Sequence, residues 1–331
     1  MKPIVKIILL FVIPILSAVF TYFILHLLLL TPYNSKSTET KLIIVSKDAK
    51  QTGKILENEK IIKNWWSFYI ISKIRSLKRP LIAGEFELSP SMTPLQIVKK
   101  INNGELKFRE LVISAGDTIT NVIDKLSNIG IENRQALEDK FYNKNYIIKL
   151  GIPSGNLEGY MFPAIYTFSF PITTEEILKK IITEGNKHWL SIYDDQTASL
   201  KMDKRQILIL ASIIEKECIE LGAPRDQLTL RSISSVYHNR LKRGLPLNAI
   251  STIYYFDPNA PRPLSDESKK KYSPFNTFAN TGLPPAPICS PSNTAIKAAL
   301  YPTSDKYITF SFDAEHRGII FENETIIPNA K

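Results

Sequence analysis

The most strongly patterned part of the chain is an uninterrupted apolar stretch near the N-terminus. No charged residue stands between Ile7 and Leu30, a stretch of about 24 residues that a helix covers in roughly 36 Å. This length is enough to span a bilayer, and it exceeds the apolar segment of a typical signal peptide. No small-residue cleavage motif follows it. The pattern therefore predicts a retained transmembrane helix over residues 7–30.

Charges beside this stretch predict its orientation. Lys2 and Lys6 precede it, whereas residues 31–40 carry only Lys36 and Glu39. Because positive flanks stay on the cytoplasmic side, residues 1–6 are expected in the cytoplasm and the rest of the chain outside it. The expected localisation is a single pass through the cytoplasmic (inner) membrane, with residues 31–40 as a tether to an extracytoplasmic, periplasmic part.

Strand and helix patterns follow one another over residues 41–110. A strand is predicted at about Leu42 to Val45, a helical stretch from Ile55 to Ile74, and a second strand at about Gly84 to Leu88. The segment from Thr93 to Asn102 begins with a capping signal and ends just before a glycine. This order predicts a small βααβ-type module.

Residues 111–331 are expected to form a larger mixed α/β domain. A strand is predicted from Leu111 to Ser114, followed by a helix with helically spaced apolar residues between Ile119 and Leu126. A further helix is predicted from Arg134 to Phe141. With the smaller module, this makes the predicted fold class α+β.

One helix of this larger domain is predicted to lie at its centre. Asp203 with Gln206 three residues later is a helix start, and the following ILILASII is apolar on nearly every side. Glu215 stands in this helix, with Ala211, Ser212, Cys218 and Ile219 three and four residues away. Such surroundings favour the protonated carboxyl that a general acid needs. The alternative is an ordinary charge at the solvated end of a helix.

Composition narrows the classes of partner. The 331 residues are 44% hydrophobic, which leaves enough length beyond the N-terminal helix for two folded domains. The formal net charge is +10, but Lys and Arg are spread along the chain without a dense basic run, so no nucleic acid partner is expected. An anionic membrane or cell-wall surface fits better. The Cys and His residues lack metal-site spacing, and neither a metal nor a cofactor is expected.

Five segments, in order along the chain, resemble the motif set of one enzyme family. They are LEGYMFPAIYTF (157–168), ASIIEKE (211–217), YHNRLKRGLPL (237–247), SPFNTFANTGLPPAPI (273–288) and SPSNTAIKAALYP (290–302). This set is similar to that of the endolytic murein transglycosylases, the YceG-like family. The segment AGEFELSPSMTPLQIVKKINNG (83–104) resembles the LysM-like part of the same family. The resemblance implies a LysM-like module over residues 41–110 and a catalytic domain over residues 111–331.

The resemblance also implies an activity. In the family the first Glu of the EKE element is the catalytic carboxylate, which is Glu215 here. Such an enzyme cleaves the bond between N-acetylmuramic acid and N-acetylglucosamine in nascent glycan strands and leaves a 1,6-anhydromuramyl end, which terminates strand elongation. Water is not consumed, so one carboxyl can act as acid and then as base. The implied partners are peptidoglycan strands, the inner membrane and cell-wall synthesis enzymes.

Other motif residues are candidates for substrate contacts. Glu158, Tyr160, Arg240 and Asn276 carry the donors, acceptors and flat faces that sugar hydroxyls and N-acetyl groups need. Each also has a structural interpretation. Tyr160 belongs to a period-two aromatic pattern typical of a strand face, Arg240 could pair with Glu158, and Asn276 could stabilise a turn. Cys218 and Cys289 are expected within disulfide reach, since the resemblance places the loop before Cys289 near the active groove.

Two positions depart from the family pattern. Ala164 and Ile250 stand where Asp residues are usual in the FPDTY and PLQSDPT segments. These departures leave open a catalytically degenerate cell-wall binding or scaffold protein, which intact Glu215 argues against. A lysozyme-like muramidase is a further alternative, and it requires a second carboxylate. Glu158 is the motif residue that could supply it.

Overall fold

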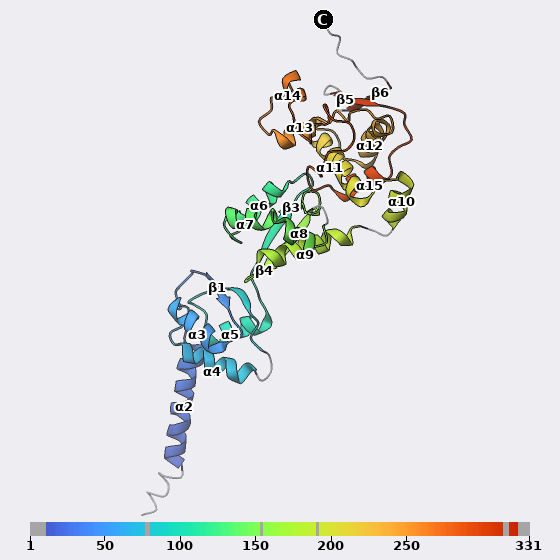
Figure 1. Ribbon diagram of the computed structural model, residues 1–331. Coiled ribbons are helices and arrows are strands. Elements are labelled where there is room, and N and C mark those ends of the chain that lie inside the picture. Colours follow the sequence, from blue (N-terminus) through green and yellow to red (C-terminus); the bar gives the residue numbers. More distant parts are fainter. Residues whose placement is uncertain (1–10, 77–79, 153–154, 190–191, 314–317, 324–331) are drawn as a thin grey trace, which may run out of the picture. The chain divides into compact units, whose positions relative to one another are not determined.

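The computed structural model describes residues 11–76, 80–152, 155–189, 192–313 and 318–323 (Figure 1). The chain divides into two compact units. The first comprises residues 1–109 with residues 167–172, and the second comprises residues 110–166 with residues 173–331.

The first helix in the described part of the first unit is α2 (Ile13–Leu30). Its Thr21 hydroxyl donates to the Ser17 carbonyl, one turn earlier. Across the described ranges, no helix is both long and apolar enough to cross a membrane. Of the predicted transmembrane helix over residues 7–30, the first four residues lie outside the described part of the chain.

The first unit has the predicted order of strand, two helices and strand, followed by a third helix. Strand β1 (Lys41–Val45) pairs antiparallel with β2 (Gly84–Leu88), so that Ile43 lies opposite Phe86. Between them come α3 (Ala49–Asn58) and α4 (Trp65–Ser76). Helix α5 (Pro94–Asn103) starts at a Thr93 capping box and ends at Gly104, which has a φ of 70°. Both strands and this last helix confirm the predicted elements.

The helical stretch predicted from Ile55 to Ile74 is not continuous, because it is divided between α3 and α4. The backbone turns between α3 and α4, where Lys60 adopts a φ of 59°. Ile61 and Ile62 both donate their N–H groups to the Leu56 carbonyl, and both side chains are buried. Burial of these two isoleucines outweighs the helix propensity of a segment that contains no breaking residue.

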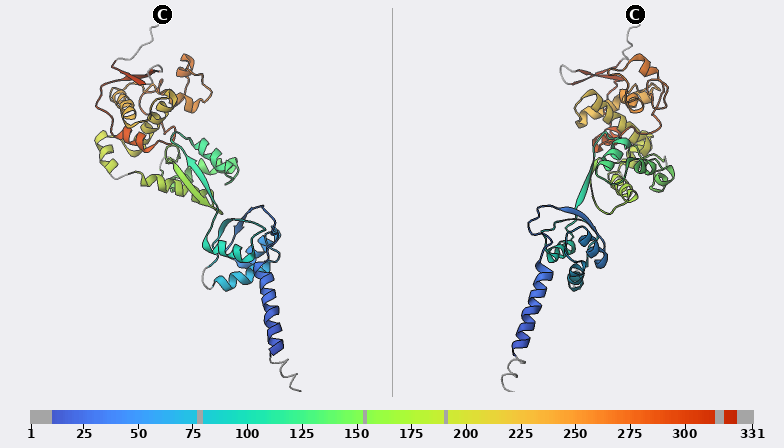
Figure 2. Two further views of the ribbon diagram at one scale, coloured as in Figure 1. Left: turned by 180° about the vertical axis from the view of Figure 1, so that it is seen from behind. Right: turned by 90° about the vertical axis from the view of Figure 1, so that its left-hand side faces the viewer.

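The second unit begins with strands and short helices. Strand β3 (Phe108–Ile113) pairs with β4 (Ala164–Ser169), and Figure 2 shows the two side by side from two further directions. The helices α6 (Ile119–Asn128), α7 (Arg134–Phe141), α8 (Lys144–Lys149) and α9 (Thr174–Lys187) complete this part. Helices α6 and α7 confirm the predictions for their segments. Strand β3 begins earlier than the predicted Leu111.

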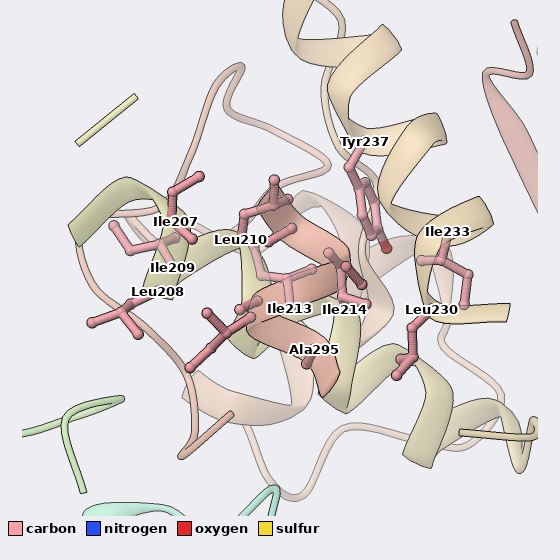
Figure 3. Packing of buried hydrophobic residues seen from close by; sticks show 14 of the residues in the cluster. Ile207, Leu208, Ile209, Leu210, Ile213, Ile214, Leu230, Ile233, Tyr237 and Ala295 are labelled. Atoms are coloured by element: carbon pink, nitrogen blue, oxygen red, sulfur yellow. The ribbon is translucent and has the colours of Figure 1, made fainter. Parts of the chain in front are cut away.

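The rest of the second unit is mainly helical. It contains α10 (Ile192–Leu200), α11 (Lys204–Leu221), α12 (Gln227–Lys242), α13 (Ile250–Phe256), α14 (Asp266–Lys270), α15 (Asn293–Leu300) and the antiparallel hairpin β5 (Thr309–Asp313) and β6 (Gly318–Glu322). Helix α11 packs against α12, α13 and α15. Figure 3 shows Leu210 and Ile214 of α11 in one apolar cluster with Ile233 and Ala295. The predicted burial of this helix on nearly every side is confirmed.

Candidate active site

The last two turns of α11 carry three carboxylates. The helix starts at an Asp203 capping box with Gln206, as predicted, and ends at Gly222, whose φ is 65°. Glu215 and Glu217 are both buried, with 1% and 3% of their surfaces exposed. Glu220 forms an ion pair with Arg262. Three acidic groups near the end of one helix need separate partners, and each has its own.

The Glu215 carboxylate is surrounded by donors. It accepts hydrogen bonds from the Ser292 backbone N–H at 3.1 Å and the Ser292 hydroxyl at 2.5 Å. A third donor is Arg225 Nη1, at 3.2 Å. Ser292 is the N-cap of α15, and Arg225 precedes α12. The sequence predicts that this carboxyl emerges from a mostly apolar, small-residue surface of its own helix, and the fold adds polar donors from residues beyond that helix.

The Glu217 carboxylate is on a different side of the helix. It accepts a hydrogen bond from the Ser251 N–H at 2.7 Å, in the first turn of α13. Burial raises the pKa of Glu217 to about 7, against the lowering effect of the Ser251 hydrogen bond. The Tyr237 hydroxyl of α12 is also in this environment, and burial raises the pKa of Tyr237 well above its usual value. Glu217 is therefore an internal carboxyl held between α11, α12 and α13.

The segment 286–292 brings several motifs to the Glu215 side of α11. The Ser212 hydroxyl accepts from the Ile288 N–H at 3.0 Å, so the segment runs along the helix one turn before Glu215. Ser290 exchanges backbone hydrogen bonds with the loop before α6, as donor to Asp117 and acceptor from Gly116. Gly159, with a φ of 81°, lies so close to Pro287 that an added Cβ would approach that ring to 2.4 Å. The LEGY, EKE, PAPI and SPSN segments thus converge here.

Glu158 lines a cavity beside this convergence. The cavity has a volume of about 530 Å³ and is lined by Thr118, Ile119, Thr120, Asn121, Tyr142, Asn156, Glu158, Lys216, Glu220, Ser251, Tyr254, Tyr255, Pro258 and Arg262. Glu158 is 2% exposed and accepts from the Ile119 N–H at 3.2 Å and the Tyr255 hydroxyl at 3.3 Å. Burial raises its pKa to about 7. Two residues of helix α11, Lys216 and Glu220, line the cavity. Glu215 and Glu217 of the same helix are not among its lining residues.

The other predicted contact residues are placed differently. Tyr160 lines a small cavity of about 30 Å³ with Phe162 and His188, outside strand β4. Arg240 is buried and donates to the backbone carbonyls of Pro246 and Ile308, and in the described part of the chain it forms no ion pair or hydrogen bond with Glu158. The suggested Arg240 to Glu158 pair is therefore wrong.

Asn276 organises a turn, as its structural interpretation predicted. Its side-chain amide donates to the Lys269 and Lys271 carbonyls, and its side-chain oxygen accepts from the Phe278 and Ala279 N–H groups. It is fully buried. The polar atoms of Asn276 are thus occupied by the backbone of its own loop.

The two cysteines do not form the expected disulfide. Both are free and buried. The Cys218 thiol lies 3.8 Å from the Pro224 carbonyl, and the Cys289 thiol lies 3.4 Å from the Ser212 carbonyl. The expected disulfide is therefore not formed, and each thiol contacts a backbone carbonyl instead. Burial raises the pKa of the Cys218 thiol to about 12.

Three residues of the site were not singled out from the sequence. Arg225 and Ser292 contact Glu215, and Lys216 lines the cavity. Ser292 carried a signal, since a Ser just before an apolar-periodic segment is a helix N-cap. Lys216 lies inside the EKE motif. No local sequence pattern predicts the contact between Arg225 and Glu215, because this contact depends on the turn after Gly222.

Comparison with known proteins agrees with this arrangement of motifs. Residues 43–325 match the model of the YceG-like family. The endolytic murein transglycosylase of Bacillus subtilis is 26% identical over 293 residues, which cover 84% of this chain and 79% of that protein. The endolytic murein transglycosylase of Streptococcus pneumoniae R6 is also 26% identical, and the match covers 91% of this chain and 59% of that protein.

A solved structure shows the same fold. The crystal structure of a YceG-like protein from Listeria monocytogenes superposes with a TM-score of 0.58 at 27% identity, covering 87% of this chain and 97% of that one. With the family model matched over residues 43–325 and the motifs gathered around the end of α11, this chain belongs to the YceG-like family.

Proposed function

We propose that this protein is an endolytic murein transglycosylase that cuts peptidoglycan strands between N-acetylmuramic acid and N-acetylglucosamine. The observation that carries the proposal is the convergence of the family motifs on the Glu215 side of α11. The names of the relatives from B. subtilis and S. pneumoniae agree with it. Cleavage within nascent strands terminates their elongation, and cell-wall synthesis enzymes are the proposed protein partners.

The proposed reaction needs one carboxyl that changes protonation state. Glu215 in its acid form gives a proton to the glycosidic oxygen, and the resulting carboxylate takes the proton of the muramic acid C6 hydroxyl as that oxygen attacks C1. The C1 bond to the leaving sugar breaks and a C1 to O6 bond forms, so the product ends in a 1,6-anhydro ring. No water is consumed.

The partners of Glu215 suit a group that cycles between two states. A serine hydroxyl can donate to a carboxylate or accept from a carboxylic acid, so Ser292 can stay bonded to Glu215 throughout. The second partner, Arg225, forms an ion pair with Glu215, and its side chain is 52% exposed.

Substrate contacts follow from the same placement. We propose Glu158, with its cavity, and Tyr160 as parts of the sugar-binding surface. Arg240 and Asn276 support that surface, because their side chains donate hydrogen bonds to the backbone carbonyls of Pro246 and of the 269–271 loop. Of the two positions that depart from the family pattern, Ala164 is the first residue of β4 and Ile250 is the first residue of α13. Ile250 precedes Ser251, whose N–H donates a hydrogen bond to Glu217.

The proposed location is the outer face of the cytoplasmic membrane. It is supported by the apolar run over residues 7–30 and by Lys2 and Lys6 before it. Residues 41–110 are proposed as a LysM-like module and residues 111–331 as the catalytic part. A reporter that works only in the cytoplasm, fused after Lys331, is expected to be inactive, and strong activity would contradict this topology.

Product masses test the reaction class. Purified glycan strands are digested with the full chain, and the released ends are weighed by mass spectrometry. The proposal predicts 1,6-anhydro ends. Reducing ends one water heavier would instead establish the muramidase alternative, in which Glu158 is the candidate second carboxylate. Absence of both products from folded protein would favour the scaffold alternative.

A further inference from the structure

The cavity that contains Glu158 has the size and lining of a binding site. Its volume of about 530 Å³ lies within the range of small-molecule pockets. The lining combines the aromatic rings of Tyr254 and Tyr255 with the side-chain amides of Asn121 and Asn156. Aromatic faces and amides together are the groups that bind sugars and their substituents.

The acidic groups of this cavity already have partners. Glu220 is paired with Arg262, whose guanidinium also lies 3.8 Å from the centre of the Tyr254 ring. Glu158 accepts the hydrogen bonds of the Ile119 N–H and the Tyr255 hydroxyl. Both acidic groups therefore have hydrogen-bond or ion-pair partners within the protein.

Lys216 is the exception. It is half-buried and lines the cavity. Its charge acts on Glu158, whose pKa it lowers, but within the described ranges no carboxylate is within ion-pair distance of its ammonium group and that group donates no hydrogen bond to the protein. A half-buried ammonium next to a sugar-sized cavity provides a site for an anion, because its hydrogen-bond donors are not taken up by described protein groups.

We propose that this cavity binds a carboxylate of the glycan strand, with Lys216 as its cation. The inference rests on the proposed function and adds the substrate group that is recognised. In a strand of alternating sugars, N-acetylmuramic acid carries the lactyl group and N-acetylglucosamine carries none. Because Lys216 directly follows Glu215 on α11, a carboxylate held there fixes which of the two sugars presents its C1 to the acid.

The carboxylate has two possible sources. In strands stripped of peptide, the lactyl group itself ends in a free carboxylate. In peptide-bearing strands that carboxyl is an amide, and the carboxylates belong to the peptide stem. The chemistry at Lys216 is the same in both cases, so the choice is made by comparing the two strand types.

Binding of single sugars tests the proposal without catalysis. The full chain is titrated with N-acetylmuramic acid and with N-acetylglucosamine, which lacks the carboxylate. The parent protein is expected to prefer the first by about tenfold or more, and Lys216→Met is expected to abolish this preference. Lys216→Arg, which keeps the charge, retains it, and Lys179→Met, at an exposed position on α9, serves as the charge-loss control. Equal affinities of the parent for both sugars, or an unchanged preference in folded Lys216→Met, would overturn the proposal.

Kinetics on strands then identify the source. A rise in KM for Lys216→Met on stripped strands alone assigns the lactyl carboxylate, and a rise on peptide-bearing strands alone assigns the stem. Unchanged KM on both would contradict a carboxylate site. Because the sugar titration measures binding alone, it tests the carboxylate site even if product masses reject the transglycosylase reaction. The two proposals can therefore fail separately.

Discussion

Two buried glutamates near the C-terminus of helix α11 have different surroundings on the two sides of that helix. Glu215 and Glu217 are two residues apart, so they point about 200° apart around the helix, and both are buried. Glu215 meets three donors, one of them a half-exposed arginine. Glu217 accepts from the Ser251 backbone N–H, has the Tyr237 hydroxyl of α12 in its surroundings and is enclosed by α12 and α13. Burial alone therefore does not distinguish the two carboxylates, and we base the proposed choice of Glu215 on the family resemblance and on its partners.

The difference also separates two functions for a buried carboxyl. On the Glu217 side, low solvation raises the pKa to about 7, but the group faces the interior of the helical core. On the Glu215 side, the carboxyl contacts the half-exposed Arg225 guanidinium and the Ser292 hydroxyl, which can donate or accept a hydrogen bond. We take the first as a packing element and the second as the group that exchanges protons with substrate.

The largest expected effect comes from Glu215→Gln. The amide keeps the shape of the carboxyl but can neither give nor take the proton, so strand cleavage should fall by about two to four orders of magnitude. Ser292 can still donate to the amide oxygen, and the free energy of unfolding should change by less than about 2 kcal/mol. Cleavage is measured as the release rate of 1,6-anhydro ends, and a parent-like rate would remove Glu215 from the mechanism.

A smaller effect is expected from Ser292→Ala. This change removes the hydroxyl that can stay hydrogen-bonded to Glu215 in both its protonated and its ionised form. Cleavage should therefore fall by about tenfold. It also removes the N-cap of α15, at a cost of about 1 kcal/mol. Ser265→Ala is the matched control, because Ser265 caps α14 in the same way. If both variants lose activity equally, the Ser292 hydroxyl has only its capping role.

The smallest effect on activity is expected from Glu217→Gln, whose consequence is in stability. Because the pKa of Glu217 is raised to about 7, the native state binds more protons than the unfolded state between about pH 4.5 and 7, and stability falls as pH rises through that window. The amide removes this penalty, so Glu217→Gln should be more stable than the parent at pH 7 by about 1 to 3 kcal/mol.

Denaturant unfolding at pH 4.5 and pH 7 measures this effect. The parent should lose more stability between the two pH values than Glu217→Gln does. Some pH dependence remains in the variant, because burial raises the pKa of Glu158 in the same direction. Equal losses in both proteins would show that Glu217 titrates alike in the folded and unfolded chain.

Local signals predicted much of the fold. The capping residues Thr93 and Asp203 mark the starts of α5 and α11, and α7 covers the predicted segment. The break between α3 and α4 could not be foreseen in this way. It depends on the burial of Ile61 and Ile62 against elements far along the chain, and the segment contains neither Gly nor Pro.

The site was less predictable than the fold. Periodicity located the buried helix and the family resemblance selected Glu215, but the donors around it come from elsewhere. Ser292 lies 77 positions away and Arg225 lies beyond the end of the helix, so neither enters a pattern of neighbours at three and four residues. Helical geometry predicts the direction of a side chain, whereas tertiary packing decides what it meets.

The central claim is that Glu215, and not Glu217, exchanges the proton with substrate. The most direct measurement is the ratio of the rates at which Glu217→Gln and Glu215→Gln release 1,6-anhydro ends from the same preparation of glycan strands. The account predicts that Glu217→Gln is faster by about a hundredfold or more. A ratio near one, or a Glu217→Gln protein that is folded and the slower of the two, would contradict it.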